Sequence, residues 1–181
     1  MIDLILEDAE ERMEKSIDAF KNELSTIRTG RANPNMLDRI NVDYWGSPTP
    51  LNQIAGVSVV EGRQLVVKPY DKTALKNIER AIFEANLGLT PQNDGQLIRI
   101  VVPPLTEERR KEFVKLVWKY AESAKVAIRN IRRSANDDIK HAGVSEDEEK
   151  YAQEDVQDLT NKYIKKIDEL GKAKEKELMT V

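Results

Sequence analysis

Apolar residues recur every three or four positions through the first part of the chain. A period near 3.6 residues predicts one long amphipathic helix. We expect this helix to end within the segment IRTGRANP at 27–34, where Gly30 suits the left-handed residue after a helix and Pro34 prevents its resumption. The apolar positions are Ile2, Leu6, Ala9, Met13, Ile17, Phe20, Leu24 and Ile27.

The hydrophobic period changes after this helix from helical to alternating. Ile40, Val42 and Tyr44 alternate with their neighbours, and the turn-forming segment GSPTP follows at 46–50, so this stretch predicts a strand and a hairpin. Apolar positions at helical spacing then return over a shorter stretch and predict a short helix, which the segment GLTPQNDG ends. The other elements expected here are strands near 56–60, 64–68 and 96–102 and a helix over roughly 73–86.

The long helical period returns after Pro103 and Pro104. Thr106 is placed to cap a second long helix that runs to about His141. Gly143 breaks it, and Ser145 with Glu148 has the spacing of a capping box at the start of a third helix. The apolar faces are Phe113, Val117, Tyr120, Ala124, Ile128, Ile131 and Ala135 in the second helix, and Val156, Leu159, Tyr163, Ile167, Leu170 and Leu178 in the third.

These elements predict an α+β protein made of two domains. Each long helix has an apolar stripe that must be covered, and three such helices can cover one another in an antiparallel bundle formed by residues 1–30 and 105–181. Residues 31–104 form a smaller β/α/β sandwich domain inserted between the first two helices. The junctions GRANP and PPLT predict hinges near 30–34 and 102–106. The hinge residues are Gly30, Arg31, Ala32, Pro103, Pro104 and Leu105.

Composition removes many functions from consideration. Among 181 residues there is no cysteine and a single histidine, His141, which excludes a disulfide framework, a thiolate nucleophile and a two-histidine metal site. No paired-carboxylate spacing, P-loop or dinucleotide-binding motif occurs. Charged residues make up 34% of the chain and no run of eighteen apolar residues is present. We therefore expect a cytoplasmic protein that is not an enzyme, with no cofactor and no metal.

A net charge of −3 hides one strongly basic stretch. Between Arg109 and Arg133 the sequence has nine bases and two acids. At 100° per residue, most of these bases fall within an arc of about 100° on the second helix, beside its apolar face. The arc holds Lys111, Lys115, Lys125, Arg129, Arg132, Arg133, Asn136 and Lys140.

This arc favours binding of a polyanion over a simple solvated face. A solvated helix face usually mixes both signs of charge, and here only Glu122 and Asp137 do so. The guanidinium group grips phosphate through two hydrogen bonds, so three arginines within five residues indicate a nucleic-acid contact.

Three further residues outside this set of bases each have two possible interpretations. Trp118 lies on the same side of the second helix and either stacks on a base or covers the edge of the bundle, and we favour the second. Arg28 and Arg31, near the end of the first helix, either contact the same polyanion or complement the helix dipole.

Several segments of the chain closely resemble ribosome recycling factors of bacteria and organelles. The matching segments are IRTGRANP at 27–34, PTPLNQIA at 48–55, PPLTEERRK at 103–111, VAIRNIRRSAND at 126–137 and EDVQDLTNKYIKKID at 154–168. The resemblance covers essentially the whole chain. It implies an L-shaped protein in which the bundle and the β/α/β domain are joined by a flexible elbow.

The same resemblance implies a function in translation. Family members bind the post-termination ribosome at the intersubunit face of the large subunit and, with elongation factor G and GTP, split it into subunits, which releases mRNA and tRNA. We therefore expect a monomer that binds large-subunit rRNA and does not act at a membrane. The expected rRNA-binding residues are Arg129, Arg132, Arg133, Lys125, Arg28, Arg31 and Arg110. The alternative from the residues alone is a helical adaptor whose acidic outer helices bind a protein.

Overall fold

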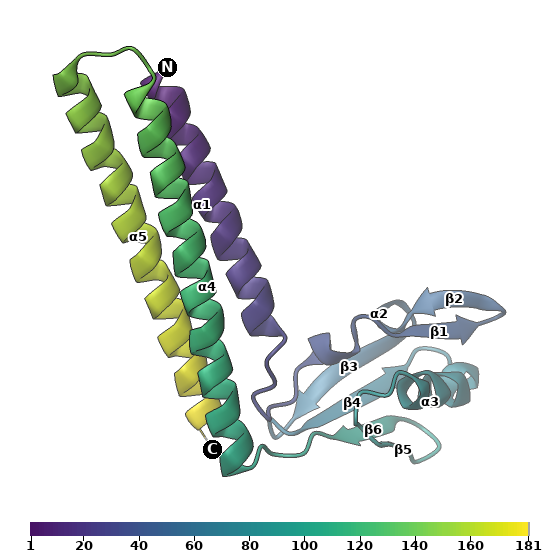
Figure 1. Ribbon diagram of the computed structural model, residues 1–181. Helices are drawn as coiled ribbons and strands as arrows, with labels where there is room; N and C mark the ends of the chain where they lie inside the picture. The colour runs from purple at the N-terminus through teal and green to yellow at the C-terminus, as the bar shows by residue number, and fades with distance from the viewer. Residues whose placement is uncertain (181) are drawn as a thin grey trace. The chain divides into compact units, whose positions relative to one another are not determined.

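The computed structural model describes residues 1–180 and divides the chain into two compact units. The helical unit consists of Met1–Arg28 and the chain from Thr106 onward, and the sheet unit is the insertion Thr29–Leu105. All the strands lie in the sheet unit together with short helices, whereas the helical unit consists of long helices alone (Figure 1), as in an α+β protein.

The helical unit is a bundle of three long helices that pack against one another in all three pairings. They are α1 (Ile2–Ser25), α4 (Glu107–Lys140) and α5 (Glu146–Met179). The N-terminus of α1 and the turn between α4 and α5 lie at the same end of the bundle, so α4 runs antiparallel to both other helices (Figure 1). The core contains fully buried side chains from every helix, and the predicted bundle is confirmed. The largest of these side chains are Met13, Ile17, Phe20, Ile128 and Tyr163.

Both predicted caps of the long helices are present. The Oγ1 of Thr106 accepts a hydrogen bond from the backbone N–H of Arg109 at 3.1 Å. The Oγ of Ser145 accepts one from the backbone N–H of Glu148 at 3.2 Å. Each bond satisfies an amide at a helix start that has no partner within the helix.

The end of α1 differs from the prediction. The helix ends at Ser25, so Gly30 is not its terminal left-handed residue. The hydroxyls of Ser25 and Thr26 each donate at 2.6 Å to a carbonyl three residues earlier, and these local bonds compete with continuation of the helix. Gly30 has a φ of 79°, but it lies in the segment that follows.

The sheet unit contains a two-stranded hairpin and a four-stranded antiparallel sheet in the order β3-β4-β6-β5. The hairpin pairs β1 (Asn41–Tyr44) with β2 (Ser47–Pro50), and the sheet contains β3 (Ala55–Val60), β4 (Gln64–Pro69), β5 (Pro91–Asn93) and β6 (Ile98–Val101). The helical elements are α2 (Leu51–Ile54), α3 (Leu75–Glu84) and the 3₁₀ turns Pro34–Leu37 and Lys72–Ala74.

One face of the sheet supplies the core of this unit. Leu65 and Val67 of β4 lie opposite Ile100 and Ile98 of β6, and all four side chains are fully buried. They pack in one hydrophobic cluster with Ile78 and Ile82 of α3. The alternating pattern of the sequence is therefore that of strands with one buried face.

The predicted hairpin is present, but its turn is shorter than the segment GSPTP, and a strand that was not predicted follows α3. Residues 47–50 of the segment GSPTP pair with β1 as β2, and the turn consists of Trp45 and Gly46, whose φ values are 53° and 80°. Residues 91–93, expected within the segment that closes α3, form β5 at the edge of the sheet. Prolines are tolerated in both places because edge strands do not need every amide for pairing.

Within residues 1–180, no helix combines the length and the apolar content that a membrane span requires.

Candidate nucleic-acid interface

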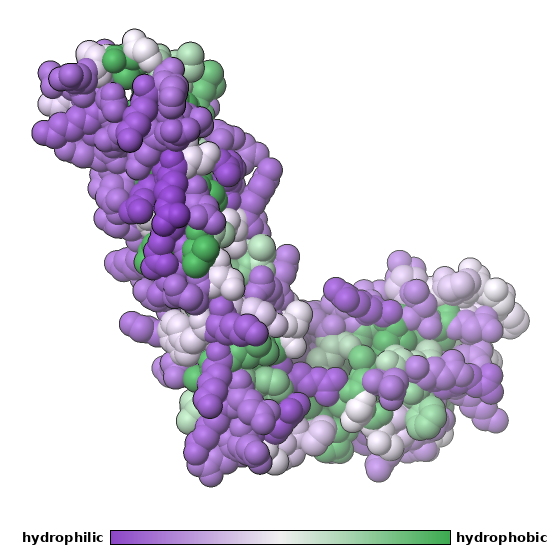
Figure 2. Space-filling model, viewed as in Figure 1, coloured by the Kyte–Doolittle hydropathy of each residue, from purple (hydrophilic) through white to green (hydrophobic). Residues whose placement is uncertain are grey.

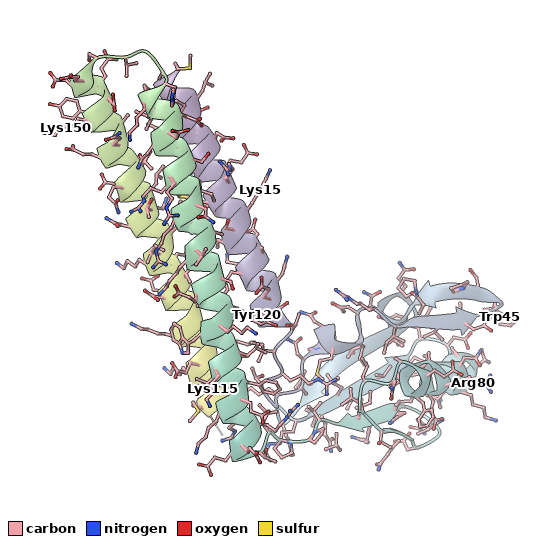
Figure 3. The ribbon with its side chains drawn as sticks, in the orientation of Figure 1. Lys15, Trp45, Arg80, Lys115, Tyr120 and Lys150 are labelled. Atoms are coloured by element: carbon pink, nitrogen blue, oxygen red, sulfur yellow. The ribbon has the colours of Figure 1, made fainter. Side chains whose placement is uncertain are left out.

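The predicted basic arc forms one side of α4, which we call the cationic face. The apolar side of α4 is buried against α1 and α5, from Val117 through Ile128 to Ile139, and this burial turns the bases outward. Lys115 projects from α4 in Figure 3, and hydrophilic side chains dominate the visible surface of the bundle in Figure 2. The face consists of Lys111, Lys115, Lys125, Arg129, Arg132, Arg133, Asn136 and Lys140.

The three arginines at the centre of the face are held differently. Arg129 donates through Nη1 to Oε1 of Glu122 at 3.2 Å, two turns earlier on the same helix. Arg132 donates through Nη1 to Oε1 of Gln157 of α5, also at 3.2 Å. Arg133 is exposed and makes no ion pair with any residue that the structure describes. A guanidinium group has five N–H donors, so all three arginines retain donors for phosphate.

Lys125 is less available than the sequence suggested. Its Nζ lies 2.6 Å from Oδ1 of Asp168 of α5, and its side chain is only 18% exposed. A charge already neutralised by a carboxylate attracts a phosphate weakly. Lys125 therefore contributes more to the contact between α4 and α5 than to the exposed positive charge.

Trp118 covers the interface between α4 and α5. A Cβ placed on the buried Gly171 of α5 would lie 3.0 Å from the indole ring, so a larger residue there would force the ring to shift. The structure thus supports the second of the two interpretations of Trp118, because its ring lies on the neighbouring helix.

Three residues of this region were not found from the sequence: Gln157, Asp168 and Gly171. Each contacts one residue of α4: Gln157 contacts Arg132, Asp168 contacts Lys125 and Gly171 contacts Trp118. These three α4 residues are seven positions apart along the helix. Positions seven apart return to the same side of a helix, so this spacing could have marked the side of α4 that faces α5.

The other predicted rRNA-binding residues are not on the cationic face of α4. Arg110 is half-buried, and at 100° per residue it lies about 40° outside the predicted arc, towards the apolar side. Arg28 and Arg31 are exposed, but Arg28 ends the first segment of the helical unit and Arg31 belongs to the sheet unit.

The two junctions of the sheet unit are attached to the same turn. The backbone N–H of Ala32 donates to the carbonyl of Gly62 at 2.9 Å, and the N–H of Val102 donates to the carbonyl of Arg63 at 2.8 Å. The turn that joins β3 to β4 therefore fixes the point at which each junction enters or leaves the sheet unit.

Gly30 and Leu105 bring the two junctions close together. A Cβ on Gly30, whose φ is 79°, would lie 3.1 Å from the backbone nitrogen of Leu105. Positive φ and close approach both favour glycine at position 30. Pro103 and Pro104 lack amide hydrogens, which limits the hydrogen bonds that the second junction can form.

The shifted pKa values in the structure belong to structural hydrogen bonds. The pKa of Asp71 is lowered because its carboxylate accepts hydrogen bonds from the side chain and backbone of Thr73. The pKa of Tyr163 is raised by burial and by the hydrogen bond that its hydroxyl donates to Glu14 at 2.7 Å. Among residues 1–180, no group of three His, Cys, Asp or Glu side chains is placed to hold a metal ion.

A family model and similar known proteins indicate the family of this chain. The family model described as "Ribosome recycling factor" matches residues 20–179. The ribosome-recycling factor of Bacillus licheniformis is 58% identical over 181 residues, covering 98% of each chain.

Solved structures agree with this result. A solution structure of a ribosome recycling factor is 45% identical, with a TM-score of 0.80 over 99% of this chain and 98% of that chain. A second structure is 44% identical, with a TM-score of 0.63 over 99% of this chain and 100% of that chain. It represents the T. thermophilus ribosome recycling factor and E. coli elongation factor G bound to the E. coli post-termination complex. The chain therefore belongs to the ribosome recycling factor family.

Proposed function

We propose that this chain is a ribosome recycling factor. It binds the post-termination ribosome at the intersubunit face of the large subunit and, with elongation factor G and GTP, splits it into subunits, releasing mRNA and tRNA. It is a non-enzymatic translation factor, because the partner hydrolyses GTP. The names of its relatives support this function, as does the related factor bound with elongation factor G to a post-termination complex.

The observation that carries the proposal is the cationic face of α4. Arg129, Arg132 and Arg133 occupy adjacent turns of α4, and each retains N–H donors that are free for phosphate. Folded rRNA presents closely spaced phosphates, which a row of guanidinium groups can bind through paired hydrogen bonds. The face anchors the helical unit on large-subunit rRNA, and Arg28, Arg31 and Arg110 add contacts outside it.

The junctions at 30–34 and 102–106 act as a hinge pair in this proposal. The β3–β4 turn holds Ala32 and Val102, so bending is confined to the few residues between these anchors and the helices α1 and α4. The sheet unit would then move as a body when the GTPase acts on the complex. The protein works as a monomer in the cytoplasm.

A binding and splitting assay tests the main proposal. The purified chain should co-sediment with 70S ribosomes and with large subunits, and binding should weaken at least about a hundredfold between 50 and 200 mM salt if about five phosphates are contacted. Light scattering should fall when elongation factor G and GTP are added. Binding that survives digestion of the RNA would instead favour the protein adaptor, and scattering that stays constant would contradict recycling.

A separate substitution tests the hinge. Gly30→Val places a side chain against the backbone of Leu105 and forces a β-branched residue into positive φ. We expect ribosome binding to be retained and subunit release to slow severalfold. Gly46→Val, at the hairpin turn, is the matched control because Gly46 also has positive φ but lies outside both junctions. Normal splitting by a folded Gly30→Val variant would refute the hinge role.

A further inference from the structure

Arg129 and Arg132 have acceptors of different charge. Arg129 contacts the carboxylate of Glu122, whereas Arg132 contacts the neutral amide oxygen of Gln157. Both hydrogen bonds are 3.2 Å long, so the difference lies in charge and not in length. A carboxylate cancels much of the field of the guanidinium group that it contacts, and an amide oxygen does not.

The amide of Gln157 is itself oriented by the next turn of α5. Its Nε2 donates to Oδ1 of Asn161 at 2.9 Å, which leaves Oε1 turned towards α4 to accept from Arg132. The two hydrogen bonds thus connect Arg132 to Asn161 through the side-chain amide of Gln157. An exposed arginine otherwise samples many rotamers, and ordering it on binding has an entropic cost.

We propose that Gln157 is a positioning residue for RNA binding, which holds Arg132 in its binding direction without neutralising it, and that Asn161 fixes the amide for this purpose. The inference rests on the proposed function, since it assumes that Arg132 contacts rRNA phosphate. It adds α5 to the binding site that the cationic face of α4 supplies. Gln157 uses one of the five donors of Arg132 and leaves the others for phosphate.

Two substitutions at position 157 separate charge from orientation. Gln157→Glu replaces the amide with a carboxylate, so Arg132 becomes ion-paired and should lose its phosphate contact. We expect large-subunit affinity to fall about tenfold and the salt dependence of log K to become shallower by about 0.7 to 0.9, the value of one phosphate contact.

Gln157→Met keeps the size of the side chain but removes the acceptor. Affinity should fall about threefold with an unchanged salt slope, because the charge remains and only its orientation is lost.

Asn161 and a charge control complete the test. Asn161→Leu should reproduce the effect of Gln157→Met, since the amide of Gln157 is then free to turn. Gln153→Glu adds the same charge one turn away on α5, where the side chain contacts Glu149, and should change affinity less than twofold. Equal losses in Gln157→Glu and Gln153→Glu would overturn the proposal by showing a general charge effect.

The Arg132→Ala background distinguishes failure of this inference from failure of the proposed function. If Arg132→Ala weakens binding and the variants at 157 add nothing to it, Gln157 acts through Arg132. If Arg132→Ala weakens binding and the 157 variants alone have no effect, the positioning role is refuted while anchoring stands. If Arg132→Ala leaves binding unchanged, the anchoring role itself is wrong, and the positioning role is refuted with it. Circular dichroism should give equal helix content for all variants.

Discussion

The two units of this protein are stabilised in different ways and have different surfaces. In the helical unit, each helix forms its backbone hydrogen bonds internally, so the helices are held together by packing and not by backbone pairing. In the sheet unit, β3, β4, β6 and β5 are joined by backbone pairing. The helical unit concentrates positive charge on α4, whereas the inserted segment from 30 to 105 has eight bases and seven acids.

This difference suits different tasks. A helix with a free side can present a row of long cationic side chains at a fixed spacing, which suits binding to a rigid RNA surface. In the proposed function, the sheet unit instead moves as one body about its junctions. The comparison predicts that charge substitutions on α4 affect RNA binding, while substitutions between the helices affect stability.

The largest effect should follow removal of two arginines, Arg129 and Arg132, from the cationic face. Arg129→Ala with Arg132→Ala should weaken large-subunit binding about a hundredfold, since two charge-assisted contacts are lost. The salt slope should become shallower by about 1.5. Co-sedimentation over a salt series measures both quantities.

A matched double variant controls for net charge. Lys165→Ala with Lys172→Ala removes two exposed bases from α5 and should change binding only slightly. Equal losses in the two double variants would show that overall charge, and not the cationic face, governs binding.

The second effect concerns the contact between Trp118 and Gly171. Gly171→Leu places a side chain where the indole ring lies, and we expect a loss of about 1–2 kcal/mol in the free energy of unfolding. This is less than overpacking alone would cost, because leucine favours the helix more than glycine does. Chemical denaturation measures the change.

Removal of the ring should relieve the conflict. Trp118→Ala should lower the free energy of unfolding less in the Gly171→Leu variant than in the wild-type chain. The two positions are then favourably coupled. Ala173→Leu, at an exposed site of α5, should have almost no effect. Additive losses would mean that the contact between the ring and position 171 contributes nothing to stability.

The third effect concerns the hydrogen bond from Tyr163 to Glu14, which joins α5 to α1. Tyr163→Phe should reduce the free energy of unfolding by about 1–2 kcal/mol, because a carboxylate loses its buried donor. Denaturation at neutral pH measures this loss. Lys172→Ala, at an exposed site of the same helix, is the control, and a loss of the same size there would argue against the hydrogen bond.

The same pair should make stability depend on pH. The pKa of Tyr163 is raised in the fold above its ordinary value of 10.0, so its contribution is complete below pH 10 and declines as the pH rises further. The pKa of Glu14 is lowered from 4.5, first by the hydrogen bond from Tyr163, so its contribution is present above pH 4.5 and declines as the pH falls. Tyr163→Phe should remove the alkaline decline and reduce the acid decline, and an unchanged profile would contradict this assignment.

The smallest effect should be an improvement in binding. Glu122→Gln removes the carboxylate that contacts Arg129, so that arginine should attract phosphate more strongly. We expect two- to threefold tighter binding, consistent with the small energy of an exposed ion pair. Glu112→Gln makes the same charge change beside Arg109 and is the control. Weaker binding by Glu122→Gln would show that Glu122 orients Arg129 and does not compete for it.

Most of the elements and the division into helical and sheet parts could be predicted from the sequence. Periodicity and caps identified all three long helices because Thr106 and Ser145 make the local bonds that their sequence positions suggest. The errors at Gly30 and in the segment GSPTP have a common cause. In both places several local conformations are possible. Side-chain hydrogen bonds of Ser25 and Thr26 select the conformation at the end of α1, and pairing with β1 selects it in GSPTP.

The sequence by itself determined where the bases lie around α4, because a helix converts spacing directly into direction. It also determined the family, through segments that extend along nearly the whole chain. Only the tertiary structure decided which of these bases remain available. Asp168 neutralises Lys125, Glu122 pairs with Arg129, and Gln157 holds Arg132 without opposing its charge. Two of these three partners lie on α5, and the packing of the helices, which depends on shape and register over the whole bundle, sets which side chains meet.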